Sequence, residues 1–450
     1  MHRSESPDPT TLDPTTFEPT ASSAGLNAEL IAHSVLEPLQ RWTAVSSLAL
    51  IAVTWRLWTP QEVYPQVPVF ESLCDAPKWI DWVALVGVLM GLTVLAITNR
   101  SRWCAVASGL VVVALLILFS LDQHRFQPWA YELALFCTVW LTCRENFRLR
   151  LLRCLMISVY FYSALGKLDF EFLHTVGQQM LGTLSSWVGL DTAKLPMGIR
   201  LIFVATFPLV ELAIALGLVW RRTRKVAGWL AIGLHCGLIA ILGPLGMNHR
   251  FGVLLWNLQV AIQVYWLFVA KQNWLFIAKQ MVAPERKQHG SLALVCNWMG
   301  ATVIGAAVAL PITERSGLWD HWPSWALYAP HSSRVQVEVS AAAIERLPEN
   351  LQKLVSLTSV DTDEMALWIR VPIDAWSLET LDTPVYPQAR FQLGVAEAIA
   401  REVDSDFQVR IKLLGTASRL SGKRYQETFT SLQQLLRACS RYWLNTQPRN

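Results

Sequence analysis

Charged side chains are scarce in this sequence, and their scarcity excludes the commonest class of protein. Only 16% of the 450 residues are charged, whereas 53% are hydrophobic and 21 residues are tryptophan. Soluble domains carry about 25% charged residues, because they need them to cover a surface that faces water. The composition therefore excludes a soluble protein and indicates a polytopic membrane protein.

The sequence also lacks the patterns that hold metals. Its eight cysteines form no CxxC pair and no zinc-like spacing, so they indicate neither a zinc site nor a thioredoxin-type centre. The nine histidines are dispersed along the chain, whereas membrane di-iron enzymes need several closely spaced histidines. We therefore expect no metal cofactor.

Two other classes of function find no support. The net charge of +4 is modest, and the basic residues cluster in short loops, which indicates membrane topology rather than nucleic-acid binding. No internal repeat and no matching pair of Gly/Pro-broken helices is present. Secondary transporters usually show both features, so a transporter is not indicated.

Composition divides the chain into three regions. Residues 1–39 are rich in Pro, Thr and Ser and lack a basic start and an early apolar core, which predicts a disordered tail rather than a cleaved signal peptide. Residues 40–311 contain apolar runs long enough to cross roughly 30 Å of hydrocarbon, and they predict an all-α polytopic domain of about nine transmembrane helices. The candidate spans lie near residues 40–58, 80–98, 103–121, 128–143, 153–172, 199–220, 226–245, 252–270 and 292–311.

Basic residues predict how these spans are oriented in the lipid bilayer. Every even-numbered loop is basic, and Lys and Arg are retained on the cytoplasmic side. The N-terminus is therefore expected to be cytoplasmic and the C-terminal region extracytoplasmic. The basic loop residues are Arg100, Arg102, Arg144, Arg148, Arg150, Arg221, Arg222, Arg224, Lys225, Lys271, Lys279, Arg286 and Lys287.

Residues 312–450 change in character and predict a small extracytoplasmic α+β domain. The segments VQVEV (335–339) and FQVRIKLL (407–414) alternate between apolar and polar residues, which is typical of strands. A third strand is expected at ALWIRV (366–371). Helices are expected at 388–403 and 424–443.

Polar side chains gather near the outer ends of the predicted spans, when depth is counted at 1.5 Å per residue. A charged group at the bilayer centre costs about 2.5 to 3.5 kcal/mol. Several such groups in one leaflet therefore predict a shared, outward-facing polar cavity around Lys167, with Glu211 and His235 nearer the midplane. The groups near the outer ends are Arg56, Asp81, Asp122, Arg125, Glu132, Lys167, Asp169, His249 and Arg250.

Each of these groups also has a structural interpretation. Lys167 is within reach of the outer interface, where it could snorkel, or it could pair with Glu171 one helical turn later. The other interpretations are an ion pair or interfacial anchors for Arg56 and Asp81, interhelical hydrogen bonds for Glu132 and Glu211, and a satisfied interior position for His235.

Three segments follow one another in a characteristic order. VYFYSALGKLDFEF contains Lys167 and is followed by a glycine and Gln178-Gln179-Met180. Phe207-Pro-Leu-Val-Glu211 precedes a basic turn at Arg222, and Gly233-Leu-His235-Cys236 comes after it. In order and spacing these segments resemble the HTTM family, which includes vitamin K-dependent gamma-carboxylase. The resemblance covers roughly residues 40–275.

The resemblance implies a carboxylase-like function. Lys167 matches the lysine that acts as a base on the reduced vitamin, and burial favours the neutral amine that this role requires. The quinol anion can then react with dioxygen to give a strong base. His235 is the second expected catalytic residue, an isoprenoid quinone in its reduced form is the expected cofactor, and an extracytoplasmic protein is a candidate substrate. The residues expected to bind the ligand are Glu132, Asp169, Glu211, His249 and Arg250.

Two departures from the family pattern keep an alternative open. Gly166 stands where the family often has a second basic residue, and the segment after His235 does not follow the carboxylase pattern. DoxX-like and MauE-like redox membrane proteins also have short helices with a Gly-Lys pair. The alternative is therefore a non-catalytic membrane redox partner or assembly factor, in which the same residues form structural ion pairs.

A disulfide is a further expectation from the predicted topology. Cys74 and Cys439 are the two cysteines placed clearly outside the membrane, where an oxidising space favours disulfides. A bond between them would tether the C-terminal domain over the polar cavity. The alternative is that Cys439 is a core residue of its amphipathic helix.

Overall fold

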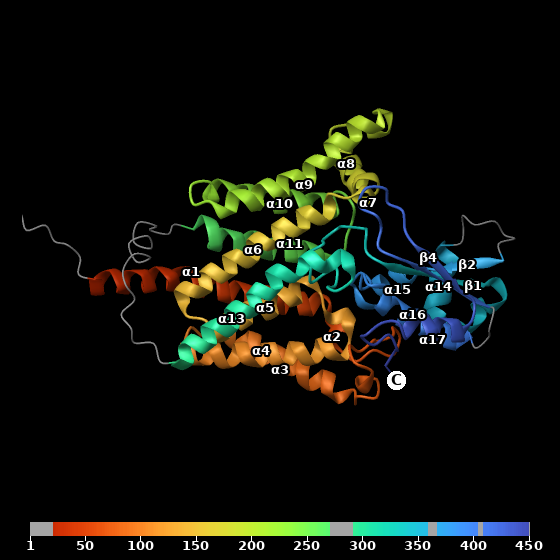
Figure 1. The fold of residues 1–450 in the computed structure, drawn as a ribbon, viewed down its shortest axis with the longest axis horizontal. Helices are drawn as coiled ribbons and strands as arrows, with labels where there is room; N and C mark the ends of the chain where they lie inside the picture. The colour runs from red at the N-terminus through yellow and green to blue at the C-terminus, as the bar shows by residue number, and fades with distance from the viewer. Residues whose placement is uncertain (1–20, 271–290, 359–366, 404–407, 450) are drawn as a thin grey trace, which may run out of the picture.

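The fold is a bundle of long helices with a smaller domain at one end (Figure 1). A computed structural model describes residues 21–270, 291–358, 367–403 and 408–449. The smaller domain, at the right of Figure 1, is formed by the C-terminal part of the chain and contains the one sheet of the described residues.

Seven helices among the described residues are long and apolar enough to cross a membrane. On one of them, α4, Val106, Leu110 and Val113 are exposed along one face, as expected for side chains that contact lipid. These helices indicate an integral, multi-pass membrane protein. They are α3 (Trp79–Ile97), α4 (Ser101–Leu121), α6 (Glu145–Lys167), α9 (Met197–Val219), α10 (Arg224–Leu242), α11 (Phe251–Val264, continued by a π-turn to Val269) and α13 (Ser291–Ala309, continued by a 3-10 turn, Leu310–Ser316).

Two of the nine expected spans are not found among these seven helices. The segment 40–58 is divided between α1 (Ala21–Val53) and the short α2 (Trp55–Trp58), with a turn between them. The segment 128–143 forms α5 (Pro128–Thr142), whose 15 residues extend about 22 Å, less than the roughly 30 Å of hydrocarbon. The first expected region also needs correction, because residues 21–39 are helical, while residues 1–20 lie outside the described chain.

The basic loops lie together at one end of the bundle. The connections α3–α4, α5–α6 and α9–α10 are at the end opposite the C-terminal domain (Figure 1). Loops that alternate between basic and non-basic along the sequence therefore lie at opposite ends of the structure. The fourth basic group, Lys271, Lys279, Arg286 and Lys287, lies outside the described residues.

The C-terminal domain has a four-stranded antiparallel sheet in the order β2-β1-β3-β4. Val337 of β1 pairs with Val371 of β2 on one side and with Ile411 of β3 on the other, and Ile411 in turn pairs with Phe429 of β4. The apolar residues of β1 are buried at every second position, as the alternating sequence predicts. The strands are β1 (Arg334–Ser340), β2 (Trp368–Val371), β3 (Val409–Leu414) and β4 (Gln426–Phe429).

The strand predictions are confirmed in their described parts, and one helix prediction is partly wrong. The helix expected at 388–403 is α16 (Ala389–Val403), whereas the one expected at 424–443 is a strand, β4, followed by the short α17 (Leu432–Cys439). Ser431 ends the strand and caps α17, because its Oγ accepts a hydrogen bond from the Gln434 N–H (3.3 Å). The remaining helices are α7 (Phe170–His174), α8 (Val176–Ser186), α14 (Glu349–Thr358) and α15 (Ile373–Leu381), and the remaining 3-10 turns are Glu71–Leu73, Gln123–Arg125, Thr192–Lys194 and Ala341–Arg346.

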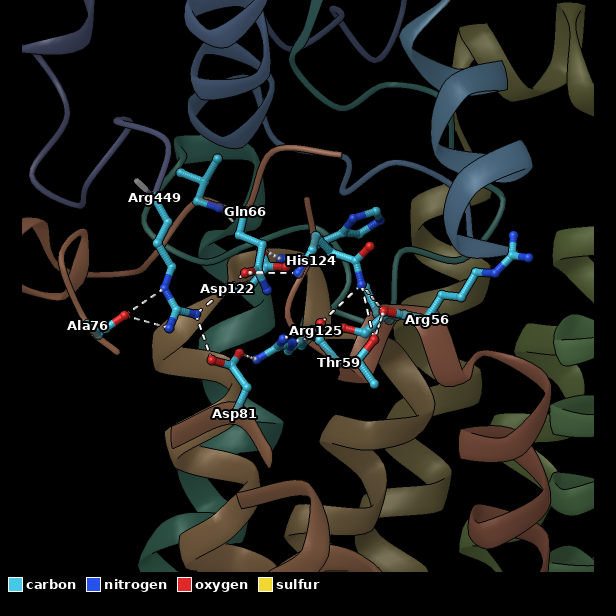
Figure 2. A network of polar contacts seen from close by, with 12 residues as sticks. Arg56, Thr59, Gln66, Ala76, Asp81, Asp122, His124, Arg125 and Arg449 are labelled. Carbon is cyan, nitrogen blue, oxygen red and sulfur yellow. Dashed lines mark hydrogen bonds and ion pairs between the residues drawn. The ribbon is translucent and has the colours of Figure 1, made fainter. Parts of the chain in front are cut away.

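The end of the chain is fastened to the membrane helices by a buried ion network (Figure 2). Asp81, in the first turn of α3, lies between two arginines: Arg125 Nη1 is 2.5 Å from its Oδ1, and Arg449 Nη1 is 2.8 Å from its Oδ2. Arg449 also donates to the Ala76 carbonyl (2.8 Å). All three ionic side chains are buried, so the tail forms part of the core at this end.

The same network corrects the ion pair expected between Arg56 and Asp81. Arg56 is exposed and donates to the Thr380 carbonyl instead. Next to the network, burial raises the pKa of Asp122 to about 6 and lowers the pKa of His124 to about 4. The neutral His124 hydrogen-bonds the Pro384 carbonyl of the C-terminal domain (2.8 Å), so this contact too joins the two parts of the chain.

Removal of Arg449 should destabilise the protein. We expect Arg449→Met to lower the free energy of unfolding by about 1–3 kcal/mol, because Asp81 keeps only one of its two partners in a buried site. The measurement is the thermal unfolding midpoint of the full chain in detergent. The control is Arg441→Met, which breaks the exposed pair with Glu427 and should change the midpoint little. Equal effects of the two substitutions would contradict a role for the buried network.

Candidate functional site

Three polar side chains lie on one face of α6. Tyr160, Ser163 and Lys167 are spaced by three and four residues, which places them one above the other on a helix. All three are buried, and Lys167 is only 4% exposed. The lysine therefore does not snorkel to the interface, and its ammonium needs partners inside the bundle.

Lys167 finds those partners on α9 and on its own helix. Its Nζ lies 2.7 Å from both carboxylate oxygens of Glu211 and 2.6 Å from the Ser163 hydroxyl oxygen. Glu211 follows Pro208 within α9 and is itself buried. The alternative pair with Glu171 is therefore wrong, and the partner of Lys167 is Glu211, which the sequence placed in the same polar region but not in contact with the lysine.

A second polar chain connects α6, α10 and α11. The Tyr160 hydroxyl is 2.7 Å from His235 Nε2, and His235 Nδ1 is 2.9 Å from Asn257 Oδ1. The Asn257 amide donates to the Val253 carbonyl (2.9 Å), so its Oδ1 is left to accept from Nδ1–H of the histidine. In the neutral form of His235, Nε2 then accepts the Tyr160 proton, so this nitrogen is the one that can act as a base.

Glu132 lies in a third cluster, between α5 and α11. Its Oε2 accepts a hydrogen bond from Trp256 Nε1 (3.0 Å). The buried side chains of Gln259 and Gln263 also lie next to this carboxyl group. Glu132 and Glu211 both interact electrostatically with Tyr160, so the three clusters form one polar region of the bundle.

Gly166 allows the segment that leads into the C-terminal domain to cross over this region. A Cβ at Gly166 would lie 3.3 Å from Ala329 Cβ, which is tighter than most Cβ contacts, and 3.5 Å from Ala326 Cβ, which is an ordinary contact. The absence of a side chain next to Lys167 thus has a packing reason. Gly166, which departs from the family pattern, lets residues 326–329 cover the end of α6.

Asp169 and Glu171 hold the C-terminal domain rather than Lys167. Asp169 Oδ1 caps α7 by accepting from the Glu171 N–H (2.8 Å), and its Oδ2 lies 2.5 Å from Arg315 Nη2. Glu171 Oε1 lies 3.2 Å from Arg424 Nε. Phe170 lies between these two acids and packs against Gly422, where a Cβ would be 2.5 Å from its ring.

The two remaining predicted residues lie apart from this region. His249 packs edge-on against the Tyr328 ring (5.8 Å between centroids), and its burial lowers the pKa of the imidazole. Arg250 is exposed and pairs with Glu379 and Asp382 of the C-terminal domain. Of the expected ligand-binding residues, the structure therefore brings Glu211 to Lys167 and Glu132 near it, and gives Asp169 and Arg250 partners at the domain boundary.

The expected disulfide is not formed. Cys74 and Cys439 are both free and buried. The Cys74 Sγ lies 3.5 Å from Asn445 Nδ2, in the C-terminal tail. The tail therefore reaches Cys74 through noncovalent contacts, and Cys439 is a buried residue of α17, as the alternative interpretation held.

Tyr160, Ser163 and Asn257 belong to the site but were not predicted. The first two could have been found in the sequence, because their spacing places them on the same helical face as Lys167. Asn257 gives a weaker signal, as a single amide within the apolar start of α11. Its partner His235 is 22 residues away in the chain, so only the packing of two helices reveals the pair.

Each residue of the Lys167–Glu211 pair should destabilise the protein when the other is removed. Lys167→Met leaves a buried carboxylate without its cation, and we expect the free energy of unfolding to fall by about 3–5 kcal/mol. The double variant Lys167→Met/Glu211→Leu should recover most of that loss, because apolar residues can replace a buried ion pair at little cost. Thermal unfolding in detergent measures both. A double variant that loses the sum of the single effects would show that the two residues are not coupled.

Known proteins give no counterpart for the polar region around Lys167. No family model, no curated protein and no solved structure matches the chain. The membership in the HTTM family that the sequence predicts therefore stays a prediction, and the functional argument rests on the contacts described above.

Proposed function

We propose that this chain is an HTTM-type membrane protein in which Lys167 and Glu211 act as an acid–base pair on the hydroxyl of a reduced quinone. The observation that carries the proposal is the contact of Lys167 Nζ with both oxygens of Glu211, 2.7 Å each, inside the helical bundle. Titratable groups kept from water in this way are typical of sites where protons are transferred.

The pair can supply a neutral amine without a change in its own net charge. An ammonium and a carboxylate in contact become an amine and a carboxylic acid when one proton moves between them. An apolar environment favours the uncharged forms. The free amine of Lys167 can then accept a proton from a substrate hydroxyl, while Ser163 and Glu211 keep its nitrogen in place.

The surrounding groups have the chemical character that binding of a quinol requires. A quinol has an apolar ring and two hydroxyls, and this region offers the Lys167 amine, the Tyr160 hydroxyl and apolar helix faces. His235 accepts from Tyr160 and can take up a proton that arrives through that hydroxyl. A reduced quinone bound here would supply electrons for oxygen-dependent chemistry, and carboxylation of an extracytoplasmic protein is the reaction that the family resemblance implies.

A non-catalytic role is the second candidate. Lys167 is fully enclosed and has three hydrogen bonds, to Ser163 and to both oxygens of Glu211. A structural ion pair needs no more than this. The protein would then be a membrane redox partner or assembly factor of the DoxX-like or MauE-like kind, and substitution of the lysine distinguishes the two candidates.

Lys167→Arg should abolish quinol-dependent activity but keep the charge. We expect oxygen-dependent oxidation of an isoprenoid quinol by the protein in lipid nanodiscs, followed by absorbance, to fall by about 10²–10⁴-fold. The reason is that a guanidinium does not give up its proton. The control is Lys194→Arg, at an exposed lysine, and thermal unfolding confirms that both variants fold. Full activity of Lys167→Arg, or no quinol oxidation by the unchanged protein, would contradict the proposal.

We also propose that the basic loops face the cytoplasm and that the C-terminal domain lies outside it. The loops that carry Arg100, Arg144 and Arg222 lie at the end of the bundle opposite that domain (Figure 1), and such loops are retained in the cytoplasm. The Lys167 region, which the domain covers, would then lie toward the outer side of the membrane.

Labelling of introduced cysteines tests this orientation. In a variant whose exposed Cys154 and Cys236 are replaced by serine, a membrane-impermeant maleimide should label Lys194→Cys and Arg441→Cys in intact cells. It should label Arg222→Cys only after the cells are permeabilised. All three positions are exposed in the structure, so the reverse pattern would mean the opposite orientation.

A further inference from the structure

We propose that Glu314, His321 and His331 bind a divalent transition-metal ion, with Zn²⁺ as the best match. The three residues lie at the end of the α13 extension, in the connector that follows it and just before β1. One ligand atom from each residue lies within 4.8 Å of the other two. The histidines, which look dispersed in the sequence, are brought together with their ring centroids 4.9 Å apart.

The distances are close to those of a metal site with three protein ligands. His321 Nδ1 lies 2.8 Å from Glu314 Oε1, and His331 Nε2 lies 3.1 Å from both Glu314 oxygens. A Zn²⁺ ion about 2.0–2.1 Å from each ligand would hold tetrahedral ligand atoms about 3.3 Å apart. The Glu314 contacts would therefore lengthen by up to about half an ångström when the ion enters, and the two histidine nitrogens, which lie within 4.8 Å of each other, would adjust to the same spacing.

Burial distinguishes this group from an ordinary surface cluster. The side chains of His321 and His331 are 3% and 1% exposed, and that of Glu314 is 11% exposed. A buried network that serves only structure normally satisfies all its polar atoms. Nε2 of His331 faces Glu314 and is the nitrogen that would bind the ion, whereas Nδ1 faces away and has no partner in the part of the chain that the structure describes. What indicates a metal ion is therefore the pair of buried imidazoles and the carboxylate that they share.

Nearby charges limit the strength of binding but do not exclude it. Arg315 and Arg419 both lie close enough to interact electrostatically with the three residues. Their positive charges oppose the binding of a cation. Arg315 is already paired with Asp169 at 2.5 Å, which offsets part of this effect. Two imidazoles and one carboxylate are a common donor set for zinc, and they leave a fourth position for water.

The place of the group in the fold suggests what the ion would do. Ala326 and Ala329 lie between the two histidines in sequence and pack directly on Gly166, beside Lys167. An ion held by Glu314, His321 and His331 would close the connector into a loop and hold it over the end of α6. The proposed metal site uses none of the residues of the proposed acid–base pair. A test of one proposal therefore does not decide the other.

Metal titration of the full chain in nanodiscs tests the inference. After treatment with a chelator, Co²⁺ as a probe should give the intense visible bands of a tetrahedral ion, and Zn²⁺ should displace it at one ion per chain. His321→Gln and His331→Gln should weaken binding by at least about 10–100-fold, since loss of even an outer partner of a ligand costs that much. The control is His174→Gln, because His174 hydrogen-bonds the Phe170 carbonyl of its own helix. This variant should bind the metal ion with the affinity of the unchanged chain.

A second measurement covers the case in which the histidine variants do not fold. X-ray absorption of the Zn²⁺-loaded unchanged protein should show two imidazole nitrogens and a carboxylate oxygen. Absence of stoichiometric binding to the unchanged protein would overturn the inference. So would an absorption spectrum without imidazole ligands, or equal affinity of folded His321→Gln, His331→Gln and the control.

Discussion

The buried ion pairs of this bundle are the contacts on which the packing of its helices depends. Removing an ion from water costs several kcal/mol, and only a close partner with further hydrogen bonds offsets the cost. Lys167 meets Glu211 across α6 and α9, and Asp81 meets Arg125 and Arg449. These contacts define which helix faces lie against one another, since a rotation of either helix would leave a charge unpaired.

Contacts of the same kind attach the C-terminal domain to the membrane helices. Arg315 and Arg424 reach the two acids that flank Phe170, immediately after Lys167 in the chain. The C-terminal tail enters the core beside α3 through Arg449, which contacts Asp81 (Figure 2). The domain is therefore fastened at separate points around the polar region, and any substrate of that region would have to pass its edge or enter from the lipid.

The polar region is not uniform in how well its groups are satisfied. Around Lys167 and His235 each side chain has defined partners, and the Asn257 amide fixes which imidazole nitrogen carries the proton. Around Glu132, by contrast, Trp256 donates one well-formed hydrogen bond, and Gln259 and Gln263 lie next to the carboxyl group. The two ends of the region thus differ in how completely their polar groups are paired.

The sequence by itself determined the membrane class, seven of the nine expected spans, three of the four strands of the C-terminal domain and the place of Lys167 within a span. These features depend on local composition and on periods of 3.6 or 2 residues, which neighbouring residues specify. Tertiary structure alone decided the partners. Glu211 is 44 residues from Lys167, and Asp81 meets Arg449 rather than Arg56. The grouping of Glu314 with two histidines also arises only when the connector folds back. Periodicity shows which face of a helix is polar, but which faces meet depends on how all the helices share one limited apolar volume.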